Sequence, residues 1–224
     1  MSRTEDTSTL QDLGRASIQI VHDLKNQLNG LKLYATFLRK RIEKGDRPED
    51  EQETIGKLIN GLDRAASDLS TIVEYGREIE LRTQSGFDLQ KILRTVCAEL
   101  SSANSLVTCK IEADSLLGEF DSSKLADAFR WISVAALKHL QNTQDSGQII
   151  ITAQLEAENG RQAVITWSGL AALEYDPFVS FSGSEEIRLS LAAKIIESHA
   201  GSAKYVNKTF VVRLPLINQG DKLK

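Results

Sequence analysis

Two long stretches in the first third of the chain place apolar residues at intervals that alternate between three and four positions. The first series is Val21, Leu24, Leu28, Leu31, Ala35, Leu38 and Ile42, and the second is Ile55, Leu58, Leu62, Ala65, Leu69 and Ile72. This spacing is typical of the buried seam of a long amphipathic helix. Gly45 and Pro48 lie between the two series, and both residue types end helices. The pattern therefore predicts a long antiparallel helical hairpin over roughly residues 8–83.

The apolar surface of this hairpin is wider than one seam, because further apolar residues flank it. They are Ile20, Leu33, Tyr34 and Phe37 on the first helix and Ile59, Ala66 and Val73 on the second. Burial of one Leu or Ile stabilises a fold by about 1.5–3 kcal/mol, so the whole stripe in water would cost more than a domain's net stability. We therefore expect two hairpins to pair as a four-helix bundle in a homodimer. The alternative is that the rest of the chain covers the stripe within one monomer.

The remainder of the chain alternates between helical and strand patterns. Apolar residues recur at helical spacing over 87–100, 121–140 and 185–198, and strand patterns cover 108–113, 148–156, 161–167 and 209–216. An Asn159–Gly160 turn joins two of the strands. Helices mixed with such strands predict a two-layer α/β sandwich. The expected fold class is α+β, with a hairpin domain over 1–84, a sandwich domain over 85–219 and a tail over 220–224.

The charge and the hydropathy of the chain limit its partners. A formal net charge of −4 over 224 residues argues against a nucleic-acid partner, which needs a basic face. No apolar run reaches the roughly 20 residues of a membrane span, and the N-terminal segment is too polar and acidic for a signal peptide. We therefore expect a cytoplasmic protein that binds neither nucleic acid nor membrane. Because the sequence begins at Met1 without a sensor segment, we expect its input to come from another protein or a small molecule.

The chain contains two cysteines, Cys97 and Cys109. Two cysteines make neither a disulfide framework nor a metal set, and we expect them to be ordinary core thiols in a reducing compartment. The His, Cys and carboxylate residues show no zinc spacing, so we expect no metal site. His139 and His199 lie near predicted helix C-termini, and we expect both to be structural or surface residues.

His22 is the first candidate for chemistry. It follows Val21 of the first seam by one position, so we expect its ring to lie off the core-facing stripe and to be open to solvent. Asp23 is adjacent, and Lys25 and Asn26 follow three and four positions later, near the same helical face. An imidazole with a pKa of about 6.5 is mostly neutral in the cytosol and can attack a phosphoryl group, while a carboxylate beside it fixes the tautomer. Without further context, a surface His beside an Asp is usually only part of a solvated face.

The segment His22-Asp23-Leu24-Lys25-Asn26 resembles the phosphoacceptor motif of histidine kinases. That motif reads His, acid, aliphatic, basic, Asn or Thr and then usually Pro, and it lies in the first helix of a dimerising hairpin. Gln27 stands here in place of the Pro, which removes a cause of helix kinking. The resemblance implies that His22 carries the phosphoryl group and that Asp23, Lys25 and Asn26 position it.

The second half of the chain resembles the ATP-binding domain of histidine kinases and of their gyrase and Hsp90 relatives. The framework positions of that family fall on Asp121–Lys138, Leu189–Glu197 and Thr209–Leu216. The residues that would bind the nucleotide are replaced. Ala135 stands for the asparagine that binds Mg²⁺, which needs oxygen donors, and Trp131 for an earlier asparagine of the same motif. Trp167 stands for the carboxylate that accepts from adenine, followed by a surviving Gly169, and Glu186 and Arg188 stand in the glycine-rich phosphate motif.

The resemblance therefore implies loss of ATP binding and no cofactor in this chain. Asn142, Asp176 and Arg188 are the residues that would have to replace the lost ligands, and surface polar roles are expected for them. With His22 in place, the chain resembles the histidine phosphotransferases of bacterial phosphorelays, such as the sporulation phosphotransferase. We expect it to relay a phosphoryl group between receiver domains of response regulators, with Mg²⁺ supplied by the receiver.

Three alternatives remain open at this level. The first is a non-catalytic pseudokinase scaffold that binds and modulates receivers or kinases. The second is a response-regulator phosphatase, because Asp23-x-x-Asn26 resembles an acid-x-x-Asn pattern that orients water. The third is an ATP-dependent histidine kinase with an unusual pocket.

Overall fold

The computed structural model describes most of the chain and divides it into two compact units. The first unit combines residues 1–77 with 181–187, and the second combines 78–180 with 188–224. The described residues are 17, 20–21, 23–24, 26–38, 40–41, 50–103, 106–111, 115–141, 147–156, 161–181 and 183–217. The segment 181–187 is thus part of the same compact unit as the hairpin.

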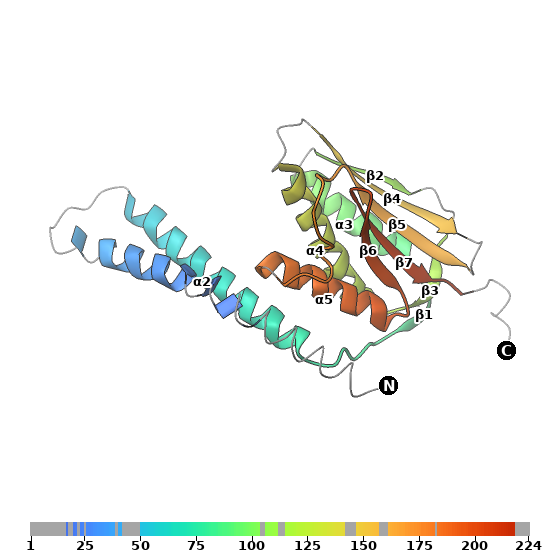
Figure 1. Cartoon of the computed structure of the whole chain (residues 1–224), viewed down its shortest axis with the longest axis horizontal. Helices are drawn as coiled ribbons and strands as arrows, with labels where there is room; N and C mark the ends of the chain where they lie inside the picture. Colours follow the sequence, from blue (N-terminus) through green and yellow to red (C-terminus); the bar gives the residue numbers. More distant parts are fainter. Residues whose placement is uncertain are drawn as a thin grey trace. The chain divides into compact units, whose positions relative to one another are not determined.

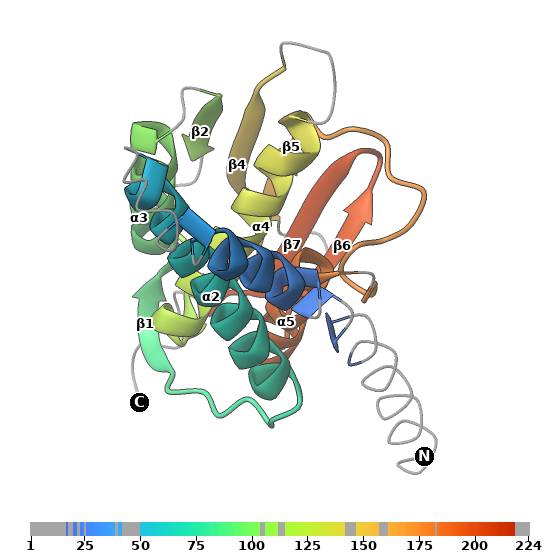
Figure 2. The same cartoon turned by 90° about the vertical axis from the view of Figure 1, so that its left-hand side faces the viewer.

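The first unit contains the predicted helical hairpin (Figure 1). Every described residue between 17 and 41 is α-helical, and the second helix is α2, Asp50–Tyr75, of 26 residues. The predicted turn around Gly45 and Pro48 lies outside the described residues. Figure 2 shows the same hairpin in an oblique, foreshortened view.

The two apolar seams of the hairpin divide into an inner and an outer set. Residues seven positions apart face inward and are buried or half-buried, namely Leu24, Leu31 and Leu38 on the first helix and Leu58, Ala65 and Ile72 on α2. The intervening members of both seams are exposed, namely Val21, Leu28, Ala35, Leu62 and Leu69. Within one hairpin, therefore, only every second apolar residue of each seam is buried, and the residues between them stay exposed to solvent.

The second unit is built on a five-stranded mixed sheet in the order β2-β4-β5-β7-β6 (Figure 1). Strand β2 pairs with β4 in parallel, and the remaining pairs of this sheet are antiparallel. Strands β1 and β3 form a separate antiparallel pair. The strands are β1 Gln84–Asp88, β2 Val107–Ile111, β3 Leu117–Phe120, β4 Ile149–Glu156, β5 Gln162–Ser168, β6 Ser202–Val206 and β7 Thr209–Pro215, and the helices are α3 Leu89–Ala103, α4 Ser122–Gln141 and α5 Ser184–Ser198.

Helices α3, α4 and α5 cover one face of this sheet (Figures 1 and 2). Alternate residues of the three central strands are buried, as expected for a strand with one covered face. They are Ile149, Ile151 and Ala153 of β4, Ala163, Ile165 and Trp167 of β5, and Phe210, Val212 and Leu214 of β7. The prediction of an α+β fold with a two-layer sandwich is confirmed.

Three short strands and one helix start differ from the sequence prediction. Strands β1, β3 and β6 were not expected, because each has only four or five residues and none shows a clear alternation of apolar and polar positions. The helix expected from Phe87 begins instead at Leu89. The Asp88 Oδ1 atom accepts a hydrogen bond from the backbone N–H of Gln90 at 3.1 Å, which is the role of an N-cap residue. The Asn159–Gly160 turn lies outside the described residues.

Asp121 caps the start of α4 and also holds the preceding segment of the chain. Its Oδ1 atom accepts from the N–H groups of Ser123 and Lys124, each at 3.1 Å, and its Oδ2 atom accepts from the N–H of Arg82 at 2.8 Å. Burial acts to raise the pKa of this carboxyl, but the three backbone donors and nearby His199 outweigh burial and hold the pKa below its usual range.

His199 is a buried neutral side chain at the end of α5, which agrees with the structural role expected for it. Its Nδ1 atom lies 2.8 Å from the carbonyl oxygen of Ile195, and its Nε2 atom accepts from the N–H of Asp121 at 3.0 Å. A ring that donates through Nδ1 and accepts through Nε2 carries one proton. Burial is the main cause that lowers the pKa of His199 below its usual value, while the Ile195 carbonyl and Asp121 oppose this shift.

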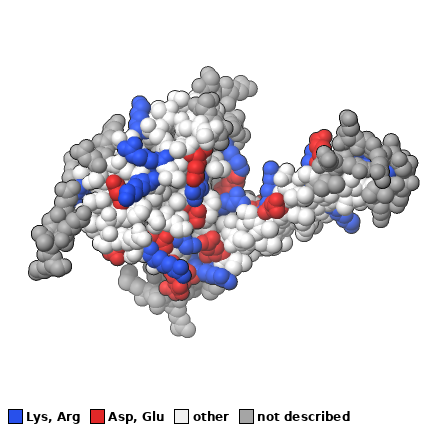
Figure 3. Space-filling view, turned by 180° about the vertical axis from the view of Figure 1, so that it is seen from behind, with Lys and Arg blue, Asp and Glu red and all other residues white. Residues whose placement is uncertain are grey.

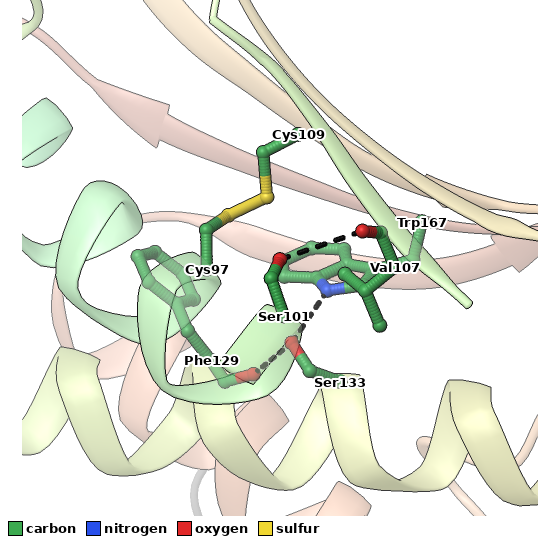
Figure 4. Close-up of a disulfide and its surroundings, with 7 residues drawn as sticks. All are labelled: Cys97, Ser101, Val107, Cys109, Phe129, Ser133 and Trp167. Carbon is green, nitrogen blue, oxygen red and sulfur yellow. Dashed lines mark hydrogen bonds between the residues drawn. A yellow bond between two sulfur atoms is a disulfide. The ribbon is translucent and has the colours of Figure 1, made fainter. Parts of the chain in front are cut away.

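The expectation that Cys97 and Cys109 are separate thiols is wrong. The two residues form a disulfide that joins α3 to β2, with their Cα atoms 6.3 Å apart (Figure 4). They lie twelve positions apart in the sequence, and the chain reverses direction between the helix and the strand. Cysteine number and spacing alone do not reveal such a pairing.

The surface carries charges of both signs. On the face shown in Figure 3, Lys and Arg side chains are interspersed with Asp and Glu side chains. Within the described residues, no helix combines the length and the apolar character needed to cross a bilayer.

Candidate functional site

The predicted phosphoacceptor segment lies in the first helix of the hairpin. His22 and Lys25 lie outside the described residues. Their neighbours Asp23 and Asn26 are helical, and Asp23 is half-buried while Asn26 is exposed. Side chains three positions apart lie on the same side of a helix, so the acid and the amide of the predicted motif share one face.

Asp68 of α2 is a buried carboxylate one helix away from this segment, and only 3% of its surface is exposed. It accepts hydrogen bonds through Oδ2 from Gln27 Nε2 at 3.3 Å and from Ser184 Oγ at 2.9 Å. Gln27 is the residue that replaces the proline of the histidine kinase motif, and its side chain ties the first helix to α2. A proline has no side-chain donor and could not make this bond.

Segment 181–187 packs on the same part of the hairpin through an apolar cluster. Ile20 and Ile187 are fully buried in this cluster. The rings of Tyr75 and Phe181 meet edge to face, with their centroids 5.3 Å apart. The partly buried members of the cluster are Leu24, Ile72, Tyr75 and Phe181. The cluster brings the region that the sequence resemblance assigns to a phosphate loop against Ile20 and Leu24, which lie on either side of His22 in the sequence.

Gly183 lies between two carboxylates from different predicted sites. A methyl group built on its Cα atom would lie 3.0 Å from Glu186 Oε2 and 3.8 Å from Asp23 Oδ2. Glu186 belongs to the degenerate phosphate motif and Asp23 to the predicted phosphoacceptor motif, so the fold brings these two residues to one place. This part of the segment therefore holds a carboxylate close to the acid of the predicted phosphoacceptor motif.

In the second unit, the indole of Trp167 occupies the interior where the resemblance places the adenine-binding carboxylate. Its exposed fraction is 0%. Its Nε1–H donates to Ser133 Oγ at 2.8 Å, and Ser133 Oγ donates in turn to the carbonyl oxygen of Phe129 at 2.7 Å (Figure 4). The Trp167 and Phe129 rings lie 5.9 Å apart. An indole N–H is only a donor and is already bonded here, so it cannot accept from an adenine amino group.

Other residues that the resemblance assigns to nucleotide binding have structural roles here. Ala135 is a buried methyl group on α4. Gly169 has a φ of 96°, and a side chain there would collide with the carbonyl oxygen of Gln148, which explains why a glycine remains. Asp176 accepts from the N–H groups of Phe178 at 3.0 Å and Tyr205 at 3.2 Å, so its oxygens are used by the backbone.

Two further candidate ligands remain. Arg188 is half-buried at the start of the second unit's part of α5, and Asn142 lies outside the described residues. In the part of the chain that the structure describes, no three His, Cys, Asp or Glu residues gather as a metal would require.

Comparison with known proteins identifies the fold. No protein-family model matches the chain, and no curated protein matches it. The Acinetobacter baumannii histidine kinase AdeS matches with a TM-score of 0.62 and 15% identity over 88% of this chain and 98% of its own. The chain has the fold of a histidine kinase. The unmatched share is smaller than either unit, so the likeness takes in residues of both the hairpin and the sandwich.

Two further solved structures, one of them a histidine kinase, support the same fold. ThkA, in complex with the response regulator TrrA, matches with a TM-score of 0.68 and 20% identity over 94% of this chain and 64% of its own. Full-length ShkA in complex with AMPPNP matches with a TM-score of 0.57 and 16% identity over 75% of this chain and 39% of its own. At these identities the likeness extends to the fold and leaves the function to be argued from the residues.

Sequence reasoning missed the residues that bind the hairpin to segment 181–187. Asp68 and Ser184 carry no local motif, and their hydrogen bond joins positions 116 residues apart. The one available signal was Gln27, an unexpected polar residue in the place of a proline. Ser133 was missed in the same way, because only the fold places its hydroxyl beneath the indole of Trp167.

Proposed function

We propose that this protein is a histidine phosphotransferase that uses His22 to relay a phosphoryl group between receiver domains, without phosphorylating itself from ATP. The observation that carries the proposal is Trp167, a wholly buried indole with its N–H bonded to Ser133 in the place of the adenine-binding carboxylate. Ala135 and Glu186 also support the absence of phosphorylation from ATP, because a methyl group binds no Mg²⁺ and a carboxylate repels phosphate. The phosphoacceptor motif around His22, by contrast, keeps all but its proline.

The proposed reaction is an in-line transfer. A neutral His22 nitrogen attacks the phosphorus of an aspartyl phosphate on a receiver, the bond from phosphorus to the acyl oxygen breaks, and the aspartate leaves as a carboxylate. Asp23 holds the other ring nitrogen and stabilises the charged product, and Lys25 and Asn26 position the phosphoryl oxygens. The receiver contributes Mg²⁺ from its own acidic site. A second receiver then takes the phosphoryl group by the reverse reaction.

A homodimer is part of the proposal. Val21, Leu28, Leu62 and Leu69 each expose half or more of their surface, although all four belong to heptad seams. In a four-helix bundle, one heptad position faces the neighbouring helix of the same hairpin and the other faces the second hairpin. The exposed set is therefore the surface on which we expect a second copy of this chain to pack.

Receiver domains in the cytoplasm are the proposed partners. The structure of ThkA contains a response regulator, which supports receivers as the class of protein that this fold meets. The mixed surface charge in Figure 3 does not favour a nucleic-acid partner.

The test follows labelled phosphate from two sources. The intact protein is mixed either with receiver domains phosphorylated by labelled acetyl phosphate or with labelled ATP and Mg²⁺. We expect acid-labile label on the wild-type protein from at least one receiver, none on His22→Ala, and transfer of that label to a second receiver. His139→Gln is the matched control and should be labelled like the wild type.

The other outcomes separate the alternatives. Direct labelling from ATP would contradict the proposal and indicate a kinase. Rapid release of inorganic phosphate that depends on Asp23 and Asn26 would indicate a phosphatase. Receiver binding with unchanged phosphate levels in wild type and His22→Ala would indicate a scaffold.

A further inference from the structure

The Cys97–Cys109 disulfide closes one edge of the second unit (Figure 4). Cys97 lies on α3, and Cys109 lies in β2, which is the terminal strand of the five-stranded sheet and pairs with β4. One turn beyond Cys97, Ser101 Oγ donates to the carbonyl oxygen of Val107 at 3.4 Å. Among the described residues, β2 is therefore linked to α3 by one covalent bond and one long side-chain hydrogen bond.

Both cysteines line a cleft on the surface of this unit. The cleft has a volume of about 690 Å³, and its lining residues are Arg94, Cys97, Cys109, Lys110 and Ile111. Cys97 is 6% exposed, whereas Cys109 is half-buried, so Cys109 is the more accessible of the two. Reduction of a disulfide requires a thiolate to reach one sulfur atom, and a cleft of this size admits one.

Among the described residues that line the cleft, the charged ones are Arg94 and Lys110, and both are exposed cations. Positive charge beside a cysteine stabilises the thiolate over the thiol. It therefore stabilises the sulfur that leaves when the disulfide is attacked, and it attracts an anionic attacking thiolate. A structural disulfide in a closed apolar interior has no such positive charge to stabilise the leaving thiolate or to attract the attacking one.

We propose that Cys97 and Cys109 form a reversible redox site that exchanges two electrons with a dithiol. One thiolate of the dithiol attacks the Cys109 sulfur, the bond to Cys97 breaks, and the Cys97 sulfur leaves with the electron pair and takes up a proton. The second thiol of the dithiol loses its proton and attacks the mixed disulfide, which releases Cys109 as a thiolate that takes up a proton in turn. The protein disulfide is reduced to two thiols, and the dithiol is oxidised to its own disulfide.

Reduction loosens β2 and leaves the rest of the unit folded. Helix α3 keeps its contact with α4, because Arg130 binds Glu99 through two hydrogen bonds, Nε to Oε2 at 2.8 Å and Nη2 to Oε1 at 3.1 Å. Strand β2, as an edge strand, keeps only its pairing with β4 among the described strands. The reduced state is therefore expected to differ from the oxidised state at residues 107–111 and not at the central strand β5.

The first experiment measures the redox equilibrium on the full wild-type chain. The protein is equilibrated with mixtures of reduced and oxidised dithiothreitol without denaturant, and free thiols are then alkylated and counted by mass spectrometry. We expect none to be modified at the oxidising end, two at the reducing end, and the same curve from either direction. Two modified thiols under oxidising conditions, or reduction only after unfolding, would overturn the proposal.

The second experiment tests the consequence for β2. In hydrogen exchange, amides of residues 107–111 should lose protection on reduction while those of Gln162–Ser168 keep theirs, and the melting temperature should fall by about 5–10 °C. Cys97→Ser and Cys109→Ser should each show the amide protection and the melting temperature of the reduced wild type, and dithiothreitol should change neither value. Equal protection of 107–111 in both redox states would contradict the proposal.

The third experiment tests the cations with an anionic thiol, mercaptoethanesulfonate. Arg94→Gln and Lys110→Gln should each slow reduction roughly threefold at low salt, the size expected for an exposed charge. Lys91→Gln is the matched control, because Lys91 is an exposed cation of α3 that does not line the cleft, and its rate should stay at the wild-type value. Equal rates of disulfide reduction in all three variants would show that Arg94 and Lys110 do not assist the reaction.

Discussion

At the residue scale, the burial of Trp167 depends on one hydroxyl group. Ser133 Oγ is the acceptor for the indole N–H, and both atoms lie in the interior of the second unit. A buried donor without an acceptor loses the bonds that it would make with water, and nothing in the interior replaces them. Ser133 thus provides the hydrogen-bond acceptor that allows the Trp167 indole to be buried at this position.

Ser133→Ala should lower the free energy of unfolding by about 1–3 kcal/mol, because it leaves the Trp167 N–H without an acceptor. Urea denaturation measures the change. Ser198→Ala is the matched control, since Ser198 makes the same bond to the carbonyl four residues earlier but is exposed. We expect the control to lie within about 0.5 kcal/mol of wild type. Equal costs for the two variants would show that the indole bond contributes nothing.

His199 makes stability depend on pH. Its pKa is lowered in the folded protein, mainly by burial, and returns to about 6.5 on unfolding. Below that value the unfolded state binds a proton that the folded state does not, so the free energy of unfolding should fall by up to about 1.4 kcal/mol per pH unit as pH decreases from about 6.5.

Urea denaturation at pH 8 and pH 5.5 measures this dependence. His199→Gln should be less stable at pH 8, because the N–H of Asp121 loses its imidazole acceptor, and it should show a smaller fall between the two pH values. An unchanged fall in the variant would assign the dependence to other groups. Asp121 acts in a separate window, since its lowered pKa removes stability only below its unfolded value of about 4.

At the scale of elements, segment 181–187 and the hairpin are joined by a polar and an apolar contact. Asp68 supplies the polar contact to Ser184, and Ile187 and Phe181 supply the apolar contact. The sequence resemblance assigns to this segment the phosphate loop of a histidine kinase. Its residues therefore serve packing against the hairpin, which explains why Ile187 is fully buried although it lies beside two charged positions.

Asp68→Ala should destabilise the first unit by about 1–3 kcal/mol, because Gln27 and Ser184 both lose their acceptor. Thermal unfolding followed by circular dichroism at a helical wavelength measures the loss. Asp63→Ala provides the comparison, since Asp63 is an exposed carboxylate on the same helix and should cost less than about 0.5 kcal/mol. A double-mutant cycle with Ser184→Ala should show coupling between Asp68 and Ser184.

The sequence predicted elements well where periodicity was long and failed where the decisive contact was tertiary. The heptads of the hairpin and the helical pattern of α4 extend over many turns, so their existence was visible in the residue spacing. Strand β6 has five residues and is defined by its pairing with β7, which no local pattern records. The disulfide and the Asp68–Ser184 bond were missed for the same reason.

At the scale of the whole molecule, the exposed heptad residues predict a dimer. A charged residue at the centre of a helical bundle is strongly unfavourable, so Leu62→Glu and Leu69→Glu should each convert the protein from dimer to monomer. Light scattering after gel filtration measures the mass. Asn60→Glu adds the same charge at an exposed position of α2 outside the seam and should remain dimeric. A monomeric wild type would contradict the predicted bundle.

The buried indole also means that a carboxylate at position 167 would be costly. Trp167→Asp would leave a cavity beside Phe129, a change that costs about 3–5 kcal/mol, and would place a charge in an apolar interior. Under the proposed function, this substitution alone would restore no metal ligand, because position 135 keeps its methyl group. Such a carboxylate would therefore be selected against before it brought any use of ATP.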